Sequence, residues 1–164
     1  MQTLNMALDK IQRNDMKRQL LASREYQKQF MTSKATLGSK EASEYVDKTM
    51  AREDGIFYFW EPQKYLLTGQ RIQRFTYLID LWIEPEYRKR KIASSLLSTF
   101  TGPVILQCLR RNPARKFYEK QNFVHLLNAL ESDTVWLYRG DKESEPLAKI
   151  LARSINVMQK KRCQ

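Results

Sequence analysis

Residues 78 to 97 limit the possible folds more than any other part of the sequence. The segment begins with an apolar strand, Leu78 to Ile83, and Pro85 marks its end. A short basic loop follows and leads directly into the pattern of an amphipathic helix. Because such a junction directs free backbone N–H groups and the positive end of the helix dipole to one spot, it suits a phosphate or pyrophosphate group. A solvated basic turn is the alternative interpretation.

A second segment strengthens the first interpretation. It runs from Asn112 to Phe123 and reads N-P-A-R-K-F-Y-E-K-Q-N-F. The strand with E-P-E-Y-R and its basic loop resembles the acyl-coenzyme A loop of the GNAT acetyltransferase superfamily. The second segment is similar to the N-P-A-R-x-x-Y-E-x-x-G-F ending of that family. The resemblance covers residues from Thr76 to Phe123, in the middle of the chain.

The sequence departs from the family pattern at two glycines. The family loop runs R-x-x-G-x-G/A, and Arg88 and Ala93 match its first and last positions. Lys91 stands where the first glycine belongs, and a glycine there lets the backbone approach a pyrophosphate without a Cβ atom in the way. Lys91 either places an ammonium near phosphate or obstructs the site. Asn122 replaces the glycine before Phe123, a mild change because asparagine tolerates the left-handed conformation.

The resemblance implies a set of cofactor-binding residues for acetyl-CoA, the expected acyl donor. Backbone groups at the end of the strand pair with the pantetheine arm in this family, and one N–H usually faces the thioester oxygen. The loop and the helix start hold the pyrophosphate, and Asn112 corresponds to a position that often contacts pantetheine. The implied residues are Leu81, Trp82, Ile83, Arg88, Lys89, Arg90, Lys91, Ile92, Ala93, Ser94 and Asn112.

Two residues are candidates for proton transfer. Tyr118 falls on the tyrosine of the family motif, and a phenol is a competent donor to a leaving thiolate. The alternative is that Phe117 and Tyr118 are aromatic core residues of a helix. Asp80 alternates with Ile79 and Leu81 on the strand before the loop and is a candidate general base. A structural hydrogen-bonding role is the alternative for Asp80.

The apolar patterns of the whole chain fit the α+β fold that the resemblance implies, with a mixed central sheet of about six to seven strands flanked by helices. We expect one or two helices within residues 1–30, with two if Asn14-Asp15 forms a break, and another helix at 42–50. Gly69-Gln70 is expected to be the turn of a hairpin that ends at Ile83. The remaining expected elements are strands at 56–60, 104–108, 123–127 and 134–139 and helices at 91–100 and 113–121. The two strands at 79–83 and 104–108 are expected to lie parallel and to splay apart.

The chain continues beyond the last expected strand. We therefore divide it into a GNAT-like domain at 1–141, with a helical part at 1–52, and an appended basic helix or tail at 142–164. The appended helix carries an apolar stripe of Leu147, Ile150, Leu151, Ile155 and Met158. That stripe packs on the domain or forms a dimer contact, while the basic end at 160–162 offers a contact for nucleic acid.

Composition limits the partners and the compartment. The formal net charge of +11 favours polyanions such as cofactor phosphates, nucleic acid or an acidic protein surface. Two unrelated cysteines and a single histidine, His125, predict neither a disulfide framework nor a metal site. His125 is expected to be a core residue. Without a membrane-spanning run or the apolar region of a secretory signal, we expect a cytoplasmic protein.

Two hypotheses for the function follow. The first is an N-acetyltransferase that moves an acetyl group from acetyl-CoA to an amine by direct attack in a ternary complex, with an unidentified acceptor. The second is a degenerate GNAT-fold protein that binds or modifies nucleic acid through its basic surface. Affinity for nucleic acid would fall steeply with salt, whereas pyrophosphate binding needs one small ligand at one site.

Overall fold

The computed structural model describes residues 2–3, 10–28, 55–129 and 133–162 of the chain. Its centre is a seven-stranded sheet in the order β1-β2-β3-β4-β5-β7-β6. All neighbouring strands are antiparallel except β4 and β5, which are parallel. The strands are β1 (Gln2–Thr3), β2 (Ile56–Glu61), β3 (Tyr65–Ile72), β4 (Phe75–Ile83), β5 (Val104–Leu109), β6 (Val124–Asn128) and β7 (Thr134–Arg139).

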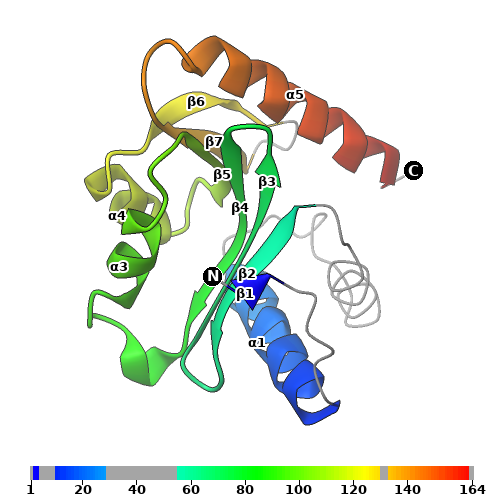
Figure 1. Cartoon of the computed structure of the whole chain (residues 1–164), viewed down its shortest axis with the longest axis vertical. Coiled ribbons are helices and arrows are strands. Elements are labelled where there is room, and N and C mark those ends of the chain that lie inside the picture. The colour runs from blue at the N-terminus through cyan, green and yellow to red at the C-terminus, as the bar shows by residue number, and fades with distance from the viewer. Residues whose placement is uncertain (1, 4–9, 29–54, 130–132, 163–164) are drawn as a thin grey trace.

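Helices cover both faces of this sheet. Figure 1 shows α3 (Ile92–Ser98) and α4 (Ala114–Lys120) on one face, and α1 (Lys10–Lys28) and α5 (Glu145–Arg162) on the other. A 3₁₀ turn, η2 (Pro85–Tyr87), lies between β4 and α3. None of the described helices is long and apolar enough to cross a membrane.

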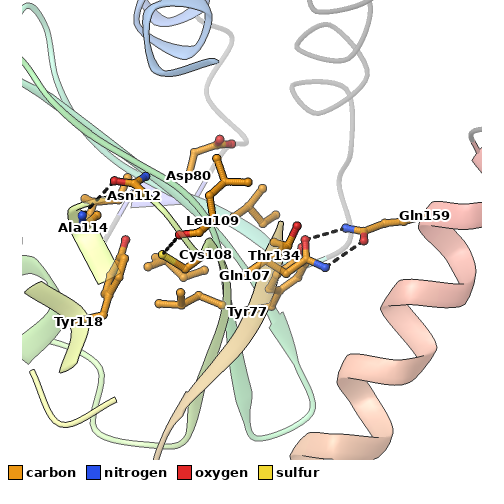
Figure 2. A pocket seen from close by; sticks show the side chains of 14 residues that line it. Tyr77, Asp80, Gln107, Cys108, Leu109, Asn112, Ala114, Tyr118, Thr134 and Gln159 are labelled. Atoms are coloured by element: carbon orange, nitrogen blue, oxygen red, sulfur yellow. Dashed lines mark hydrogen bonds between the residues drawn. The ribbon is translucent and has the colours of Figure 1, made fainter. Parts of the chain in front are cut away.

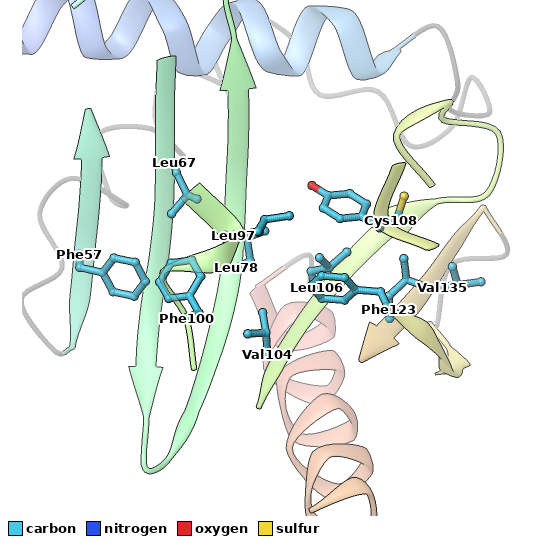
Figure 3. Close-up of a cluster of buried hydrophobic side chains, with 12 residues drawn as sticks. Phe57, Leu67, Leu78, Leu97, Phe100, Val104, Leu106, Cys108, Phe123 and Val135 are labelled. Carbon is cyan, nitrogen blue, oxygen red and sulfur yellow. The ribbon is translucent and has the colours of Figure 1, made fainter. Parts of the chain in front are cut away.

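The strand alternation produces separate cores on the two faces. On the α3 and α4 face, side chains such as Phe57, Leu97 and Phe100 form one cluster with residues from β4, β5 and β7 (Figure 3). On the opposite face, α5 packs over Ile105 and Trp136, and α1 packs over a third cluster on β2 and β3. The predicted α+β sandwich of a mixed sheet between helices is therefore confirmed.

β4 and β5 part after a short paired stretch. They are paired only from Thr76 with Val104 to Leu78 with Leu106. A β-bulge then shifts the register between β3 and β4, because Gly69 pairs with Leu78 while Thr68 pairs with Asp80. A bulge bends its strand and increases the local twist, and this one lies where the two parallel strands separate. The predicted splaying is confirmed, and it opens the sheet at its centre.

Two expectations about local structure, the position of the hairpin turn and the burial of His125, were wrong. The hairpin turn lies at Gln73 and Arg74, where Gln73 has a left-handed φ of 56°, and Gly69 lies inside β3. Gly69 is there because a Cβ atom would come within 2.5 Å of the Phe57 ring. α1 is one continuous helix through Asn14, which is the first of the two arrangements expected there. His125 is exposed on β6 and contacts the Asn128 side chain at 3.0 Å.

The buried face of α5 also differs from the expected stripe. Its deepest residues are Ala148 and Ala152, both fully buried against the sheet, with Ile155 beside them. Leu147 and Ile150 are exposed, at 47% and 58%. Small alanines allow the helix to pack closely on the sheet, with Leu151 and Ile155 of the expected stripe against the same cluster. The helix expected at 42–50 lies outside the described residues.

Candidate active site

A cavity of about 290 Å³ occupies the place where β4 and β5 separate. Because it lies between strands, side chains from both faces of the sheet reach it. Figure 2 shows this pocket with the side chains that surround it. The lining residues are Tyr77, Leu78, Ile79, Asp80, Leu81, Leu106, Gln107, Cys108, Leu109, Asn112, Ala114, Tyr118, Thr134 and Gln159.

Tyr118 reaches the pocket from α4. It is 9% exposed, and its ring stacks edge-on against Phe117 and Phe123, which fixes the side chain. In Figure 2 the hydroxyl end points into the space near Asn112 and Asp80. Burial raises the pKa of Tyr118 above its ordinary value, and the nearby Cys108 and Asp80 raise it further. The phenol is therefore protonated at neutral pH and can act as a donor.

Asp80 reaches the same pocket from β4. It is 3% exposed, and its Oδ2 atom accepts a hydrogen bond of 3.0 Å from the Thr68 hydroxyl. Thr68 is itself fully buried on β3, directly opposite Asp80 in the strand register. The structural role expected as an alternative is therefore present in the hydrogen bond to Thr68. The same carboxyl group lines the cavity, so it is also available to chemistry there.

Cys108 on β5 is a third chemically active group in the pocket. Its thiol is 5% exposed and donates weakly to the Leu109 carbonyl at 3.5 Å. Burial raises the pKa of this thiol to about 11, a change that Arg115 opposes and Glu119 adds to. A thiol with that pKa is a poor nucleophile at neutral pH, because the thiolate is the reactive form.

The basic loop has an unusual backbone. Lys89 and Lys91 have φ angles of 63° and 61°, and Lys91 lies in the left-handed region directly before α3. The glycine of the family pattern is therefore replaced at a position where the backbone favours glycine. The first helical hydrogen bond comes from the Ser95 N–H to the Lys91 carbonyl at 3.0 Å. The N–H groups of residues 92–94 precede it and have no acceptor within the helix.

Arg88 does not point toward the start of α3. Its Nε atom donates to the Ile83 carbonyl at 3.0 Å. Its guanidinium lies over the rings of Trp82 and Tyr26, 4.8 and 5.2 Å from the ring centroids. Arg88 therefore joins the end of β4 to α1, and three exposed cations, at 89–91, remain on the loop. A second link to α1 is the 2.8 Å ion pair between Arg18 and Glu84.

Asn112 shapes the start of α4. Its side-chain oxygen accepts a hydrogen bond of 2.9 Å from the Ala114 N–H, as capping residues do. Asn112 also lines the pocket, where its carboxamide lies near the Tyr118 hydroxyl (Figure 2). Farther along, the Ser94 hydroxyl donates to the Gln121 carboxamide at 3.2 Å and connects α3 to α4. The two sequence segments of the predicted site are thus in direct contact.

Comparison with known proteins supports this geometry. Residues 52–125 match the family model described as an acetyltransferase (GNAT) domain. The matched segment includes both sequence motifs, β2 to β5 and most of the residues that line the pocket between β4 and β5. The resemblance expected from the two motifs is therefore confirmed, and it supports an enzyme of the N-acetyltransferase class. No curated protein sequence matches the chain.

Solved structures of GNAT proteins share the fold at low sequence identity. An acetyltransferase from Thermus thermophilus is 14% identical, with 77% of this chain and 89% of that chain covered at a TM-score of 0.57. The PaiA N-acetyltransferase of Thermoplasma acidophilum, in complex with coenzyme A, is 14% identical. That alignment covers 83% of this chain and 97% of that chain at a TM-score of 0.58. An aminoglycoside 6'-N-acetyltransferase, also complexed with coenzyme A, is 15% identical. That alignment covers 84% of this chain and 94% of that chain at a TM-score of 0.55. At these identities the likeness shows the fold alone.

The pocket between β4 and β5 brings together only part of the predicted site. Four predicted residues line it, namely Asp80, Leu81, Asn112 and Tyr118. Trp82, Ile83 and the loop residues 88–94 are outside its lining. Within the described residues, no group of His, Cys, Asp and Glu is arranged to hold a metal ion. The pocket lining also includes four polar residues that no sequence motif marks, namely Tyr77, Gln107, Thr134 and Gln159.

Proposed function

We propose that the protein is an acetyl-CoA-dependent N-acetyltransferase that transfers the acetyl group to an amine by direct attack in a ternary complex. One observation carries the proposal: the Tyr118 hydroxyl and the Asp80 carboxyl line one pocket at the point where β4 and β5 separate. Acyl transfer from a thioester to an amine requires a base that takes a proton from the amine and an acid that gives a proton to the leaving thiolate. Coenzyme A complexes of proteins with this fold add support for the acyl donor.

The start of α3 and the loop before it are proposed to hold the pyrophosphate. The N–H groups of Ile92, Ala93 and Ser94 have no acceptor within the helix, and the Lys89, Arg90 and Lys91 side chains are exposed beside them. Arg88 supports the loop indirectly, because its guanidinium is bound to the Ile83 carbonyl and to two aromatic rings.

The free edge of β4 is proposed to hold the pantetheine arm. From Asp80 to Ile83, β4 is paired with β3 on one side only, since its pairing with β5 ends at Leu78. Alternate backbone groups of Leu81, Trp82 and Ile83 therefore face the gap. An extended arm with amide groups can pair with such an edge as an added strand does. An N–H group there is the proposed donor to the thioester oxygen.

Tyr118 is the proposed donor to the leaving thiolate. Burial keeps the phenol protonated, and it also makes the phenol a weaker acid than an exposed tyrosine. The same pocket raises the pKa of the Cys108 thiol to about 11. A coenzyme A thiolate released beside Cys108 would be equally poorly solvated and would therefore be a stronger base than in water. Because burial raises the proton affinity of both groups, the Tyr118 phenol can still protonate that thiolate.

Asp80 is the proposed acceptor of the amine proton, directly or through a water molecule. It is the one acidic side chain among the described residues of the pocket lining. The Thr68 hydroxyl holds one carboxyl oxygen and so fixes the orientation of the group. Removal of the proton from the attacking ammonium frees the electron pair that forms the new C–N bond.

Direct attack is favoured over an acyl-enzyme. Cys108 lines the pocket together with Tyr118, and burial raises the pKa of its thiol to about 11. At pH 7 a thiol with that pKa is ionised to only about one part in 10⁴. Its sulfur would therefore compete poorly with an amine for the thioester.

The comparisons give no support to the alternative of a degenerate, nucleic-acid-binding GNAT protein. The cytoplasmic location, the two-part division at 141/142 and contacts with nucleic acid, an acidic protein or a second copy of the chain stay predictions. A salt titration of nucleic-acid binding tests the basic surface separately, because counterion release makes that affinity fall steeply with ionic strength.

The Tyr118→Phe variant tests the proposal. It removes one hydroxyl from the pocket and keeps the ring contacts with Phe117 and Phe123. We expect kcat for acetyl transfer to fall by about 10²-fold or more, because general acid catalysis contributes that much. Affinity for acetyl-CoA, followed as the ligand-dependent rise in Tm, should stay the same.

Tyr87→Phe is the matched control, since Tyr87 is on the loop and outside the pocket lining. It should keep kcat within about twofold of the original protein, as surface changes usually do. An unchanged kcat in Tyr118→Phe would remove the phenol from the mechanism. A joint fall in kcat and in acetyl-CoA affinity would show instead that Tyr118 only shapes the cofactor site.

A further inference from the structure

The pocket has a wall that the family motifs do not supply. On this side, Gln107 of β5 and Gln159 of α5 form a reciprocal carboxamide pair, 52 residues apart in the chain. Gln107 Nε2 donates to Gln159 Oε1 at 3.0 Å, and Gln159 Nε2 donates to Gln107 Oε1 at 3.3 Å. Figure 2 shows the pair at the edge of the pocket, where α5 approaches the sheet. The C-terminal helix therefore contributes directly to the pocket.

A buried indole fixes the orientation of this pair. The Trp136 N–H can only donate, and it donates to Asn156 Oδ1 at 3.0 Å. The same oxygen accepts from Gln107 Nε2 at 3.3 Å, which turns the Gln107 amino group toward α5. Gln107 Oε1 is then placed to accept from Gln159. Trp136 is fully buried and Asn156 is 6% exposed, so this chain of hydrogen bonds is held rigidly in the core.

The pair retains hydrogen-bonding capacity. A glutamine carboxamide has two N–H donors and two acceptor lone pairs. With its described partners, Gln159 uses one N–H and one lone pair, both toward Gln107. One N–H donor and one acceptor lone pair therefore remain on Gln159, on the two outer flanks of its carboxamide, because the reciprocal pair uses the inner sites. The carbonyl of a ligand amide can accept from the free N–H, and the N–H of a ligand amide can donate to the free lone pair.

The charges of the pocket limit the acceptor further. Although the chain has a net charge of +11, no lysine or arginine is among the described residues that line the pocket, and Asp80 is its one charged side chain. An ammonium group is attracted to Asp80. A carboxylate or phosphate close to that amine would find no cation in this lining and would lose its hydration on entry. The rest of the acceptor near the amine is therefore neutral and polar.

We propose that the Gln107–Gln159 pair is the specificity element for the acceptor, and that it binds a neutral amide group of an amine such as an amino-acid amide or a peptide. This inference rests on the proposed acetyltransferase function, and it assigns to α5 a role in reading the acceptor. The amine lies toward Asp80, and the amide lies against Gln159. The basic surface of the chain then serves the cofactor phosphates and not the acceptor.

The test compares acceptors that differ in one group. The full-length protein is assayed with acetyl-CoA and three forms of one amino acid: the amide, the methyl ester and the free carboxylate. We expect kcat/KM for the amide to exceed that for the ester by roughly three- to tenfold, the worth of one neutral hydrogen bond. The carboxylate should be the poorest acceptor. The ester is the informative comparison because it keeps the carbonyl and loses the N–H.

Gln159→Leu should abolish the preference for the amide over the ester by raising KM for the amide, while the Tm rise with acetyl-CoA stays the same. Met158→Ala is the matched control on the same helix, since Met158 is 53% exposed and outside the pocket lining. It should keep the preference of the original protein.

Each other result overturns one specific statement. Equal kcat/KM for amide and ester in the original protein, or an undiminished preference in Gln159→Leu, overturns the role of the carboxamide pair. The same follows if acetyl-CoA binds but the amide is not acetylated. A protein that does not bind acetyl-CoA at all overturns the proposed function itself, so the two failures are distinguishable.

Discussion

The Lys91→Gly variant tests how the loop before α3 is built. Lys91 has φ 61° and ψ 19°, a left-handed conformation that costs a residue with a Cβ atom roughly 1–2 kcal/mol. Glycine removes that cost, but its greater freedom in the unfolded chain costs about 0.4–1 kcal/mol. The difference leaves a net stabilisation of roughly 0.5–1 kcal/mol. For a chain of this length we expect Tm to rise by about 1–4 °C.

Two matched variants separate the backbone effect from the loss of charge. Lys89→Gly also removes one cation at a left-handed position, because Lys89 has φ 63°. Arg90→Gly removes one cation between them, at a residue without positive φ. Since Arg90→Gly relieves no backbone strain, we expect its free energy of unfolding to fall by about 0.5–1 kcal/mol. The Lys91 and Arg90 variants should therefore differ by roughly 1–2 kcal/mol.

Denaturant unfolding and acetyl-CoA titration of the three variants form the assay. Equal losses of unfolding free energy in Lys91→Gly and Arg90→Gly would refute the left-handed conformation as the source of the difference. In the titration, Lys91→Gly should keep or improve affinity for acetyl-CoA, because glycine is the family residue there. A complete loss of binding would show instead that the Lys91 ammonium is an essential phosphate ligand.

Three further predictions concern packing and the pocket thiol. Gly69→Ala should lower the free energy of unfolding by about 1–3 kcal/mol in a denaturant titration, because a Cβ atom would come within 2.5 Å of the Phe57 ring; an unchanged midpoint would refute that contact. Ile155→Ala should lower the free energy of unfolding by about 2–5 kcal/mol, because Ile155 is buried. Ile150→Ala, at an exposed site, should change that free energy by no more than about 0.5 kcal/mol. The reverse order would show that the opposite face of α5 packs on the sheet. Burial raises the pKa of Cys108 to about 11 from 9.0. The buried, protonated thiol therefore contributes its full share of the folding free energy below pH 9, and this contribution is lost as the pH rises through 11. Alkylation of its peptide, followed by mass spectrometry, should be slow at pH 8 and accelerate toward pH 11, and rapid labelling of the native protein at pH 8 would contradict this.

The sequence was most informative where local patterns decide the structure. The strand at 78–83, the basic loop and the helix after it were predicted because alternation, a proline and helical spacing lie within one continuous segment. Tyr118 was identified through its motif, and the structure places it both in a core cluster and in the pocket. The two interpretations of that residue, as core and as donor, were not exclusive.

The errors arise where packing between distant segments decides the outcome. Gly69 carries a turn-like signal, but it is a glycine because the Phe57 ring of the neighbouring strand leaves no room for a side chain. On α5, hydrophobicity favoured the large residues, whereas close approach to β7 selected Ala148 and Ala152 for the buried face. Arg88 has the expected charge, yet the rings beneath it and the Ile83 carbonyl turn it away from the start of α3.

The carboxamide pair could not be predicted for the same reason. Gln107 lies within a strand, Gln159 lies near the end of α5, and neither belongs to a recognisable motif. Their meeting depends on the angle at which α5 crosses the sheet. A glutamine within an otherwise apolar strand, V-I-L-Q-C-L, is the signal that points to a polar contact on that face.

The most direct test of the account is thermal unfolding of the full-length protein with acetyl-CoA at matched ionic strength. A ligand at 100 times its dissociation constant adds about 2.7 kcal/mol of stability. For a chain of this size that corresponds to a rise in Tm of about 5–10 °C, which is the result we expect. No rise at millimolar acetyl-CoA would contradict the central claim that the gap between β4 and β5 and the loop before α3 form an acyl-CoA site.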